Sequence, residues 1–176
     1  MAKPSAAVET AKNYYDSADA DTFYALIWGG EDIHIGLYQG ANDDIAAASQ
    51  RTIAHMAKQL SVEPEAHILD LGSGFGGASR YLASNHGAHV TALNLSSVEN
   101  ERHRQLNERT GLSDSITVID GNFEDIPCPD EHFDIVWSQD AILHSDTRET
   151  VLREVDRVLK KKGQFIFTDP MQSDTC

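Results

Sequence analysis

The sequence predicts an α/β domain built on a doubly wound, mainly parallel sheet. Three observations support this prediction: short apolar runs alternate with segments of helical periodicity, a glycine-rich turn follows the first run, and unusual polar residues stand where the runs end. Right-handed crossovers between parallel strands place a ligand crevice at the carboxyl ends of the strands. We therefore expect the functional site at that edge of the sheet.

Length and charge narrow the class of protein. The 176 residues, 40% of them hydrophobic, can bury one core. No apolar run approaches the roughly 20 residues that cross a bilayer, and the first five residues lack the apolar core of a secretory signal, so we expect a cytoplasmic protein. A net charge of -14 would repel phosphate backbones and anionic membranes, so we expect neither nucleic acid nor membrane as a partner.

Metal-binding patterns are missing from the sequence. Cys128 and Cys176 stand far apart without CxxC spacing, which indicates neither a disulfide framework nor a zinc site. The histidines, among them His34, His55 and His103, show no H-x-x-x-H or carboxylate spacing. We therefore expect no metal.

The first 62 residues precede the alternating pattern. Asn42 or Asp43 can cap a helix whose apolar positions keep mostly to one face. These positions are Ile45, Ile53, Met56 and Leu60. Pro64 then breaks the chain before the first strand. We expect a helical lid or substrate segment over residues 1–62 and an α/β domain over residues 63–176.

The first two strands are each followed by a helix. The first strand is expected at His67–Leu71, followed by the glycine turn and a helix that can stop at Gly87. The second strand, His89–Leu95, runs into Ser96-x-x-Glu99, a capping box that opens a helix ending near Gly111.

Three further strands complete the predicted sheet. They are expected at Ile116–Asp120, Phe133–Trp137 and Gln164–Thr168. A helix before the last strand has the apolar positions Val151, Leu152, Val155, Val158 and Leu159.

The glycine turn indicates a nucleotide-type ligand. Gly72, Gly74 and Gly77 satisfy G-x-G-x-x-G between a strand and a helix, where a dinucleotide would place its pyrophosphate. Asp70 favours instead a ligand with a cationic ammonium and sulfonium, and Asn94 stands where a dinucleotide site has an acid for the ribose hydroxyls. These residues argue against a nicotinamide-dependent dehydrogenase, which stays open as an alternative, as does a turn without a ligand.

The segment Asp70–Gly77 resembles motif I of class I S-adenosylmethionine-dependent methyltransferases, and the resemblance continues to Thr168-Asp169. It implies a turn over residues 158–163 before the fifth strand, with Lys162 where glycine is usual. Gly121–Asp125 resembles the adenine-binding motif, with Phe123 as the ring contact and Asn122 where Asp is commoner. The resemblance implies a Rossmann-like methyltransferase fold, S-adenosylmethionine as the cofactor and S-adenosylhomocysteine as its product. The implied cofactor-binding residues are Asp70, Gly72, Ser73, Gly74, Gly76, Asn94, Leu95, Asn122, Phe123 and Gln139.

An aromatic N-terminal stretch and the segment Ser138–Ser145 together resemble the sarcosine and dimethylglycine N-methyltransferases that make the osmoprotectant glycine betaine. They resemble the phosphoethanolamine N-methyltransferases more distantly. Most of these aromatic residues are expected to pack on the sheet, although aromatic faces also attract methylated ammonium groups by ~0.5 to 2 kcal/mol each. The resemblance implies that Tyr15, or else Tyr14, pairs with His144 for catalysis. Implied substrate contacts are Tyr14, Trp28, Tyr38 and Asp140.

Members of this family continue past the fifth strand with a helix and two further strands, one of them antiparallel. Nothing after Met171 supplies these elements, so we expect a C-terminally incomplete domain. A non-catalytic cofactor-binding fragment is one alternative. A sterol-type methyltransferase is another, because Asn94 also resembles that branch of the family.

Overall fold

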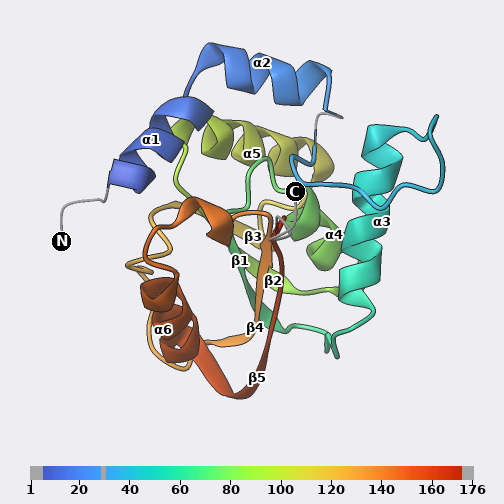
Figure 1. The fold of residues 1–176 in the computed structure, drawn as a ribbon. Helices are drawn as coiled ribbons and strands as arrows, with labels where there is room; N and C mark the ends of the chain where they lie inside the picture. Colours follow the sequence, from blue (N-terminus) through green and yellow to red (C-terminus); the bar gives the residue numbers. More distant parts are fainter. Residues whose placement is uncertain (1–5, 29–30, 172–176) are drawn as a thin grey trace.

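A five-stranded parallel sheet forms the centre of the structure, a computed structural model that describes residues 6–28 and 31–171 (Figure 1). The strands are β1 (His67–Leu71), β2 (His89–Asn94), β3 (Ile116–Asp120), β4 (Phe133–Gln139) and β5 (Leu159–Thr168). The helices are α1 (Ala6–Tyr15), α2 (Ala18–Leu26), α3 (Ile45–Ala57), α4 (Gly77–His86), α5 (Ser97–Thr110), the 3-10 helix η1 (Ile142–His144) and α6 (Arg148–Val158). The strand order is β3-β2-β1-β4-β5 with all pairs parallel, which confirms the predicted doubly wound fold.

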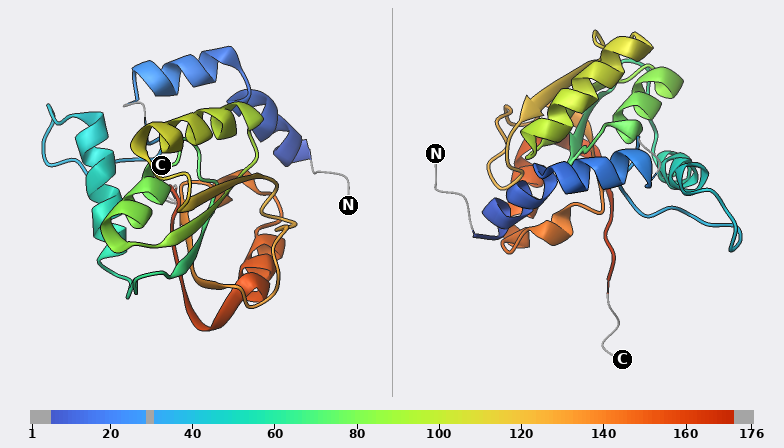
Figure 2. Two further views of the ribbon diagram at one scale, coloured as in Figure 1. Left: turned by 180° about the vertical axis from the view of Figure 1, so that it is seen from behind. Right: turned by 90° about the horizontal axis from the view of Figure 1, so that it is seen from above.

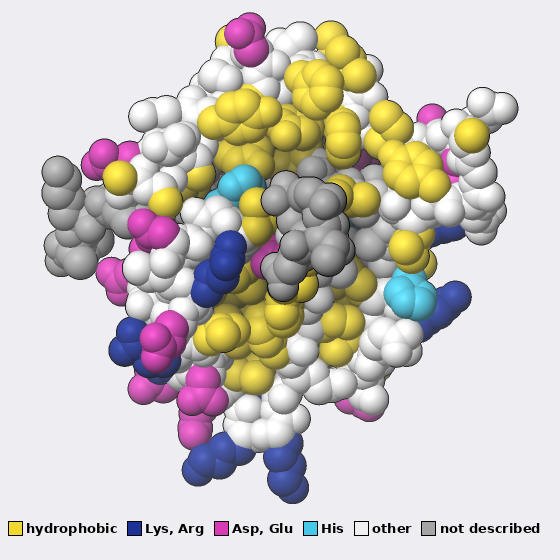
Figure 3. Space-filling view, in the orientation of Figure 1, with side chains coloured by type: hydrophobic (Ala, Val, Ile, Leu, Met, Phe, Trp, Pro, Cys, Tyr) yellow, Lys and Arg dark blue, Asp and Glu magenta, His cyan; other side chains and the backbone are white. Residues whose placement is uncertain are grey.

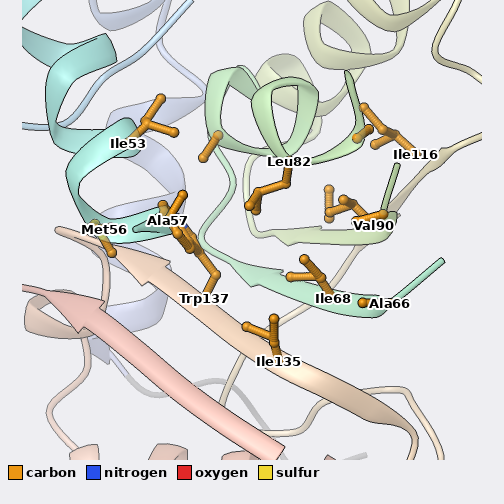
Figure 4. Packing of buried hydrophobic residues seen from close by; sticks show 14 residues of the cluster. Ile53, Met56, Ala57, Ala66, Ile68, Leu82, Val90, Ile116, Ile135 and Trp137 are labelled. Atoms are coloured by element: carbon orange, nitrogen blue, oxygen red, sulfur yellow. The ribbon is translucent and has the colours of Figure 1, made fainter. Parts of the chain in front are cut away.

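Helices cover both faces of the sheet, with α3, α4 and α5 on one side and α6 on the other (Figure 2). Successive residues of a strand point to opposite faces, so the sheet has two cores. On β1, Ile68 packs in the cluster that contains Leu82 of α4, whereas Leu69 packs with Val151 of α6. Figure 4 shows that Trp137 of β4 lies in the first cluster, next to α3. α3 comes before the predicted domain boundary near residue 62, and it packs in one core with residues that come after this boundary. The boundary itself stays a prediction.

Several predicted boundaries are confirmed. β1 and β3 have the predicted bounds, and α4 and α5 end at Gly87 and Gly111. These two glycines have φ angles of 67° and 70°, which glycine adopts without steric cost. Ser96 caps α5, because its Oγ accepts a hydrogen bond from the Glu99 backbone N–H at 3.2 Å. β2 ends one residue earlier than predicted and β4 two residues later.

The start and end of α3 correct the prediction. Its N-cap is Asp44 and neither Asn42 nor Asp43. The carboxylate of Asp43 pairs with Arg51 instead, which takes it away from the first turn of the helix. Leu60, expected on the apolar face of this helix, lies beyond the helix end.

The last strand differs most from the prediction. β5 begins at Leu159, directly after α6, whereas we expected a turn over residues 158–163 and a strand from Gln164. Its pairing with β4 shifts register near its start, where Lys162 has a φ of 70°. The extra residues form an irregularity within the strand. Apolar periodicity could not reveal this, because Leu159 also fits the helical pattern.

Two surfaces of the molecule carry exposed apolar side chains. Figure 3 shows hydrophobic side chains gathered over α2 and over the side of the sheet that ends in β5. Among the exposed apolar residues, Leu26 ends α2, Ile27 follows it and Phe167 belongs to β5. Among the described residues, no helix is long and apolar enough to cross a membrane. Cys128 is a half-buried free thiol, and Cys176 lies outside the described residues.

Candidate functional site

The main cavity lies at the carboxyl ends of β1 to β4, under α1. It is partly open to solvent, and it is lined by residues of α1 and by residues that follow these strands. Nine of the predicted site residues line it: Tyr15, Gly72, Asn94, Leu95, Asn122, Phe123, Gln139, Asp140 and His144. The structure thus brings these nine residues together, and their contact with a ligand stays a prediction. The prediction from sequence missed Glu99, and it missed the apolar lining from Val8, Ala11 and Ile33.

Tyr15 and His144 meet at one wall of the cavity. The Tyr15 hydroxyl lies 3.0 Å from His144 Nε2, and the two rings pack edge to face. Burial, with a smaller contribution from Glu99, raises the pKa of Tyr15 to about 12. Burial also lowers the pKa of His144 below its usual value. The pair is therefore neutral near pH 7 and can accept or donate a hydrogen bond toward a ligand. Tyr14 lines an outer groove along α1 instead, which Tyr15 and His144 also line.

A buried carboxylate faces the cavity after β2. Asn94 Nδ2 donates a hydrogen bond of 2.8 Å to Glu99 Oε2, and both side chains are buried in the cavity wall. We predicted Glu99 only as a member of a capping box. Its position in the first turn of α5 could have indicated this contact. Helical side chains lean back toward the N-terminus of the helix, which here is the end of β2. A carboxylate thus stands beside Asn94, although the residue that ends β2 is not itself an acid.

A second, smaller cavity adjoins the first beside the glycine turn. One wall is made by residues 31–35, which we call the crossing segment. The opposite wall includes Asp70, Gly72, Ser73, Gly77 and Gln139. The crossing segment lies so close to the turn that a Cβ on Gly74 would stand 2.7 Å from Ile33 Cδ1. A side chain at position 74 would displace the end of the Ile33 side chain and would also need the φ of 50° that glycine adopts there.

Four buried polar atoms in this second cavity have no hydrogen-bond partner in the described residues. They are Asp32 Oδ1, His34 Nε2, Ser73 Oγ and Gln139 Nε2. Buried polar atoms are normally paired, so their convergence on one cavity indicates a ligand or ordered water. The Nδ1 of His34 faces the Ile35 carbonyl at 3.4 Å. In the neutral ring with Nδ1 protonated, Nε2 is then an acceptor, and it lies 3.6 Å from Asp32 Oδ1.

This cavity therefore offers two acceptors, Asp32 and His34, and two groups that can donate, Ser73 and Gln139. A group with several N–H donors fits the acceptors, and an anionic group fits the donors. A zwitterion such as the amino-acid end of S-adenosylmethionine carries both. The residues present thus fit this ligand.

Asp70 lies at the bottom of the second cavity. Its side chain is buried, and its Oδ2 accepts a hydrogen bond of 2.6 Å from Ser79 Oγ. Burial raises the pKa of Asp70 to about 6, although the hydrogen bond from Ser79 opposes the shift. The predicted role of Asp70 as the charge complement of a cationic ligand stays a prediction.

Other predicted site residues have partners in the protein. Asp140 accepts hydrogen bonds from Ile35 N–H at 2.7 Å and from Thr168 Oγ1 at 3.0 Å, so it fastens the crossing segment to β5. Trp28 donates its indole N–H to the His34 carbonyl at 3.2 Å. Tyr38 is half-exposed. The substrate contacts expected of Asp140, Trp28 and Tyr38 stay predictions.

Gly76 does not line either cavity, and a Cβ there would collide with the ring of His103. His103 is fully buried, and burial lowers its pKa to about 3. Gly76 has a φ of 82°, and it lets α5 approach the turn closely. Gly74 and Gly76 therefore shape the turn, and their contact with a cofactor stays a prediction.

A parallel sheet with a glycine turn after β1 and a cavity at its carboxyl edge defines an α/β protein that binds a nucleoside-type ligand. Residues 69–167, more than half of the chain, match the family model described as a methyltransferase domain, so the chain belongs to this family. It is 56% identical over 171 residues to the sarcosine/dimethylglycine N-methyltransferase of Halorhodospira halochloris, covering 97% of this chain and 61% of that protein. It is 57% identical to the glycine/sarcosine/dimethylglycine N-methyltransferase of Actinopolyspora halophila, covering 97% of this chain and 30% of that protein.

Among solved structures, a proposed sarcosine dimethylglycine methyltransferase from Galdieria sulphuraria has a TM-score of 0.86 and 45% identity, covering 92% of this chain and 62% of that chain. The [4+2]-cyclase SpnF also has a TM-score of 0.86, at 22% identity, which is a likeness in fold alone. Fold and function are therefore separate questions here. The chain spans less than two thirds of the length of each of these proteins.

Proposed function

We propose that the chain binds S-adenosylmethionine and forms the cofactor-binding part of an N-methyltransferase that acts on sarcosine or dimethylglycine. The observation that carries this proposal is the matched polar lining at two ends of one continuous site. Asn94 and Glu99 stand at one end, and the four unpartnered atoms of the second cavity stand at the other. A shared identity of 50 to 57% with N-methyltransferases of these acceptors supports the choice of substrate.

Each part of the site fits one part of the cofactor. Asp32 and His34 would accept hydrogen bonds from its ammonium group, and Ser73 with Gln139 would donate to its carboxylate. Glu99, oriented by Asn94, would accept from the ribose hydroxyls, the role that an acid after the second strand has in dinucleotide sites. Asn122 and Phe123 line the main cavity and would receive the adenine. When bound, the cofactor supplies an electrophilic methyl group on a sulfonium.

The Tyr15–His144 pair would handle the acceptor amine. Secondary amines such as sarcosine lose a proton on methylation, and a neutral His144 can accept it. Dimethylglycine is a tertiary amine and loses no proton, so for this acceptor the pair would only hold the amine in line. Val8 and Ala11 of α1 cover the cavity and would keep water out. The product from dimethylglycine would be glycine betaine.

The direct test uses the full-length protein with isothermal calorimetry and labelled S-adenosylmethionine. We expect binding of S-adenosylhomocysteine and methyl transfer to sarcosine or dimethylglycine, with less transfer to glycine or phosphoethanolamine. A sterol acceptor is less favoured, because the sterol 24-C-methyltransferase of Yarrowia lipolytica shares only 32% identity. Absence of S-adenosylhomocysteine binding would overturn the proposal. NADH binding in its place would favour the dehydrogenase alternative, and binding without transfer a non-catalytic role.

A second test separates catalysis from cofactor binding. His144→Ala should lower kcat by about 100-fold, the lower end of general-base contributions, with little change in S-adenosylhomocysteine affinity. The matched control is His132→Ala, an exposed histidine at the opposite edge of the sheet, which should change neither. Because burial lowers the pKa of His144, the rate with sarcosine should fall only at a pH below the usual histidine value. A rate that is unchanged in His144→Ala would remove this residue from the reaction.

A further inference from the structure

Trp137 is a tryptophan of the core that makes one directed polar contact. Its side chain is 0% exposed and lies on β4 among the apolar cluster beside α3 (Figure 4). Its indole Nε1–H donates a hydrogen bond of 3.0 Å to Oε1 of Gln139. Residues two apart on a strand share a face, so β4 itself brings the two side chains together. The contact thus joins the core to the edge of the ligand site.

This hydrogen bond permits only one orientation of the Gln139 amide. An indole N–H is only a donor, so the amide must present its carbonyl oxygen to Trp137. The amide nitrogen, with its two hydrogens, is thereby turned the other way. Gln139 Nε2 is buried, has no partner among the described residues, and belongs to a side chain that lines both cavities. A rotated amide would place donor against donor at Trp137.

We propose that Trp137 is a positioning residue that fixes the Gln139 amide so that its N–H groups face the anionic end of the ligand. The inference rests on the proposed function, since it takes that anionic end to be the carboxylate of S-adenosylmethionine. Asp32 and His34 on the crossing segment offer acceptors, so the same cavity needs a fixed donor to distinguish the carboxylate from the ammonium. The hydrogen bond from Trp137 to the Gln139 oxygen supplies this fixed orientation.

The experiment compares two ligands by calorimetry, S-adenosylhomocysteine and 5′-methylthioadenosine, which lacks the amino-acid end. Trp137→Phe keeps an aromatic ring in the core and removes the donor. We expect this variant to bind S-adenosylhomocysteine about 3- to 10-fold more weakly, which is the effect of one neutral hydrogen bond. Its affinity for methylthioadenosine should be unchanged. An equal loss for both ligands would mean a merely structural role, and no loss for either would mean no role. Both outcomes overturn the proposal.

Gln139 variants keep the test decisive if Trp137→Phe does not fold. Gln139→Leu should show the same selective loss. Gln139→Glu should lose more, because a carboxylate can still accept from Trp137 but then presents a second acceptor to an anion. Adding Trp137→Phe to Gln139→Leu should cause no further selective loss, because a positioning residue acts only through its partner. A further loss of the same size would contradict the proposal. If the wild-type protein binds methylthioadenosine and S-adenosylhomocysteine equally well, the amino-acid end is not recognised here, whereas binding of neither overturns the proposed function itself.

Discussion

The glycine turn, residues 70–77, and the crossing segment, residues 31–35, face each other across the second cavity, yet they are held in different ways. The turn is held mainly by residues near it in the chain: Asp70 accepts from Ser79, and the Gly76 N–H donates to the Ser73 carbonyl at 2.8 Å. The crossing segment is held by distant residues, since Ile35 donates to Asp140. Local hydrogen bonds make the turn a scaffold that the surrounding sequence specifies.

The two regions also differ in what they leave unpaired. The carboxylate of Asp70 is paired with Ser79, whereas Oδ1 of Asp32 has no hydrogen-bond partner among the described residues and its Oδ2 accepts from Gln50 at 2.7 Å. His34 on the same segment has an unpaired Nε2. The comparison teaches that the acid recognised in the motif is hydrogen-bonded to the helix after the turn. A carboxylate oxygen without a hydrogen-bond partner among the described residues comes instead from the segment that lies over the turn.

The largest effect is expected from Gly76→Ala, which disturbs the scaffold. The added methyl group would need a φ of 82° and would collide with the buried ring of His103. The two costs together should lower the free energy of unfolding by roughly 2 to 5 kcal/mol, measured by urea denaturation. The control is Gly87→Ala, which has a φ of 67° but open space around the new methyl group. If both variants lose the same free energy of unfolding, the close packing of His103 against the turn does not contribute to stability.

Asp70→Asn should remove the pH dependence that the Asp70 carboxyl gives to the free energy of unfolding. The pKa of Asp70 is about 6 in the folded protein and 3.8 without the fold, so the folded state holds this proton more tightly. The resulting stabilisation is complete below the unfolded pKa and is lost as the pH rises through about 6. The variant should therefore gain stability relative to wild type between pH 4 and pH 7, by on the order of 3 kcal/mol. Urea denaturation across this range measures the gain, and a constant difference would contradict it.

Asp32→Asn should weaken ligand binding more than Asp70→Asn does. The asparagine oxygen can still accept from Gln50, which leaves an amide N–H₂ where Asp32 Oδ1 stood, facing the expected ammonium. Loss of one charge-assisted hydrogen bond should reduce S-adenosylhomocysteine affinity by about 10-fold, measured by calorimetry. If Asp70→Asn lowers the affinity more than Asp32→Asn does, Asp70 is the charge complement of the ligand.

The smallest effect is expected from Glu31→Gln in the crossing segment. Glu31 lies 3.3 Å from the buried guanidinium of Arg80, but its own side chain is 56% exposed. Solvent screens such a pair, so the free energy of unfolding should change by less than about 1 kcal/mol. A much larger loss would show that the crossing segment unfolds together with the core, and the two regions would then be one cooperative unit.

Much of the fold could be predicted because its signals are local. Gly87 and Gly111 end helices with positive φ angles, and Ser96 caps a helix through its own side chain. β5 was predicted poorly, since the irregularity at Lys162 depends on pairing with β4. The candidate site shows the same contrast between local signals and contacts that depend on distant segments. Residues at strand ends, such as Asn94 and Gln139, were found because parallel strands bring their ends to one edge.

The sequence by itself determined the sheet, the glycine turn and the set of strand-end residues, because these follow from periodicity and from the backbone needs of glycine. Only the tertiary structure decided which side chains face the ligand cavity with atoms left unpaired. Asp32 and Asp70 are far apart along the chain, and the segment around Asp32 has no periodicity to predict its path. The contact of Glu99 with Asn94 and that of Trp137 with Gln139 depend on side-chain orientation, which packing decides and residue spacing does not.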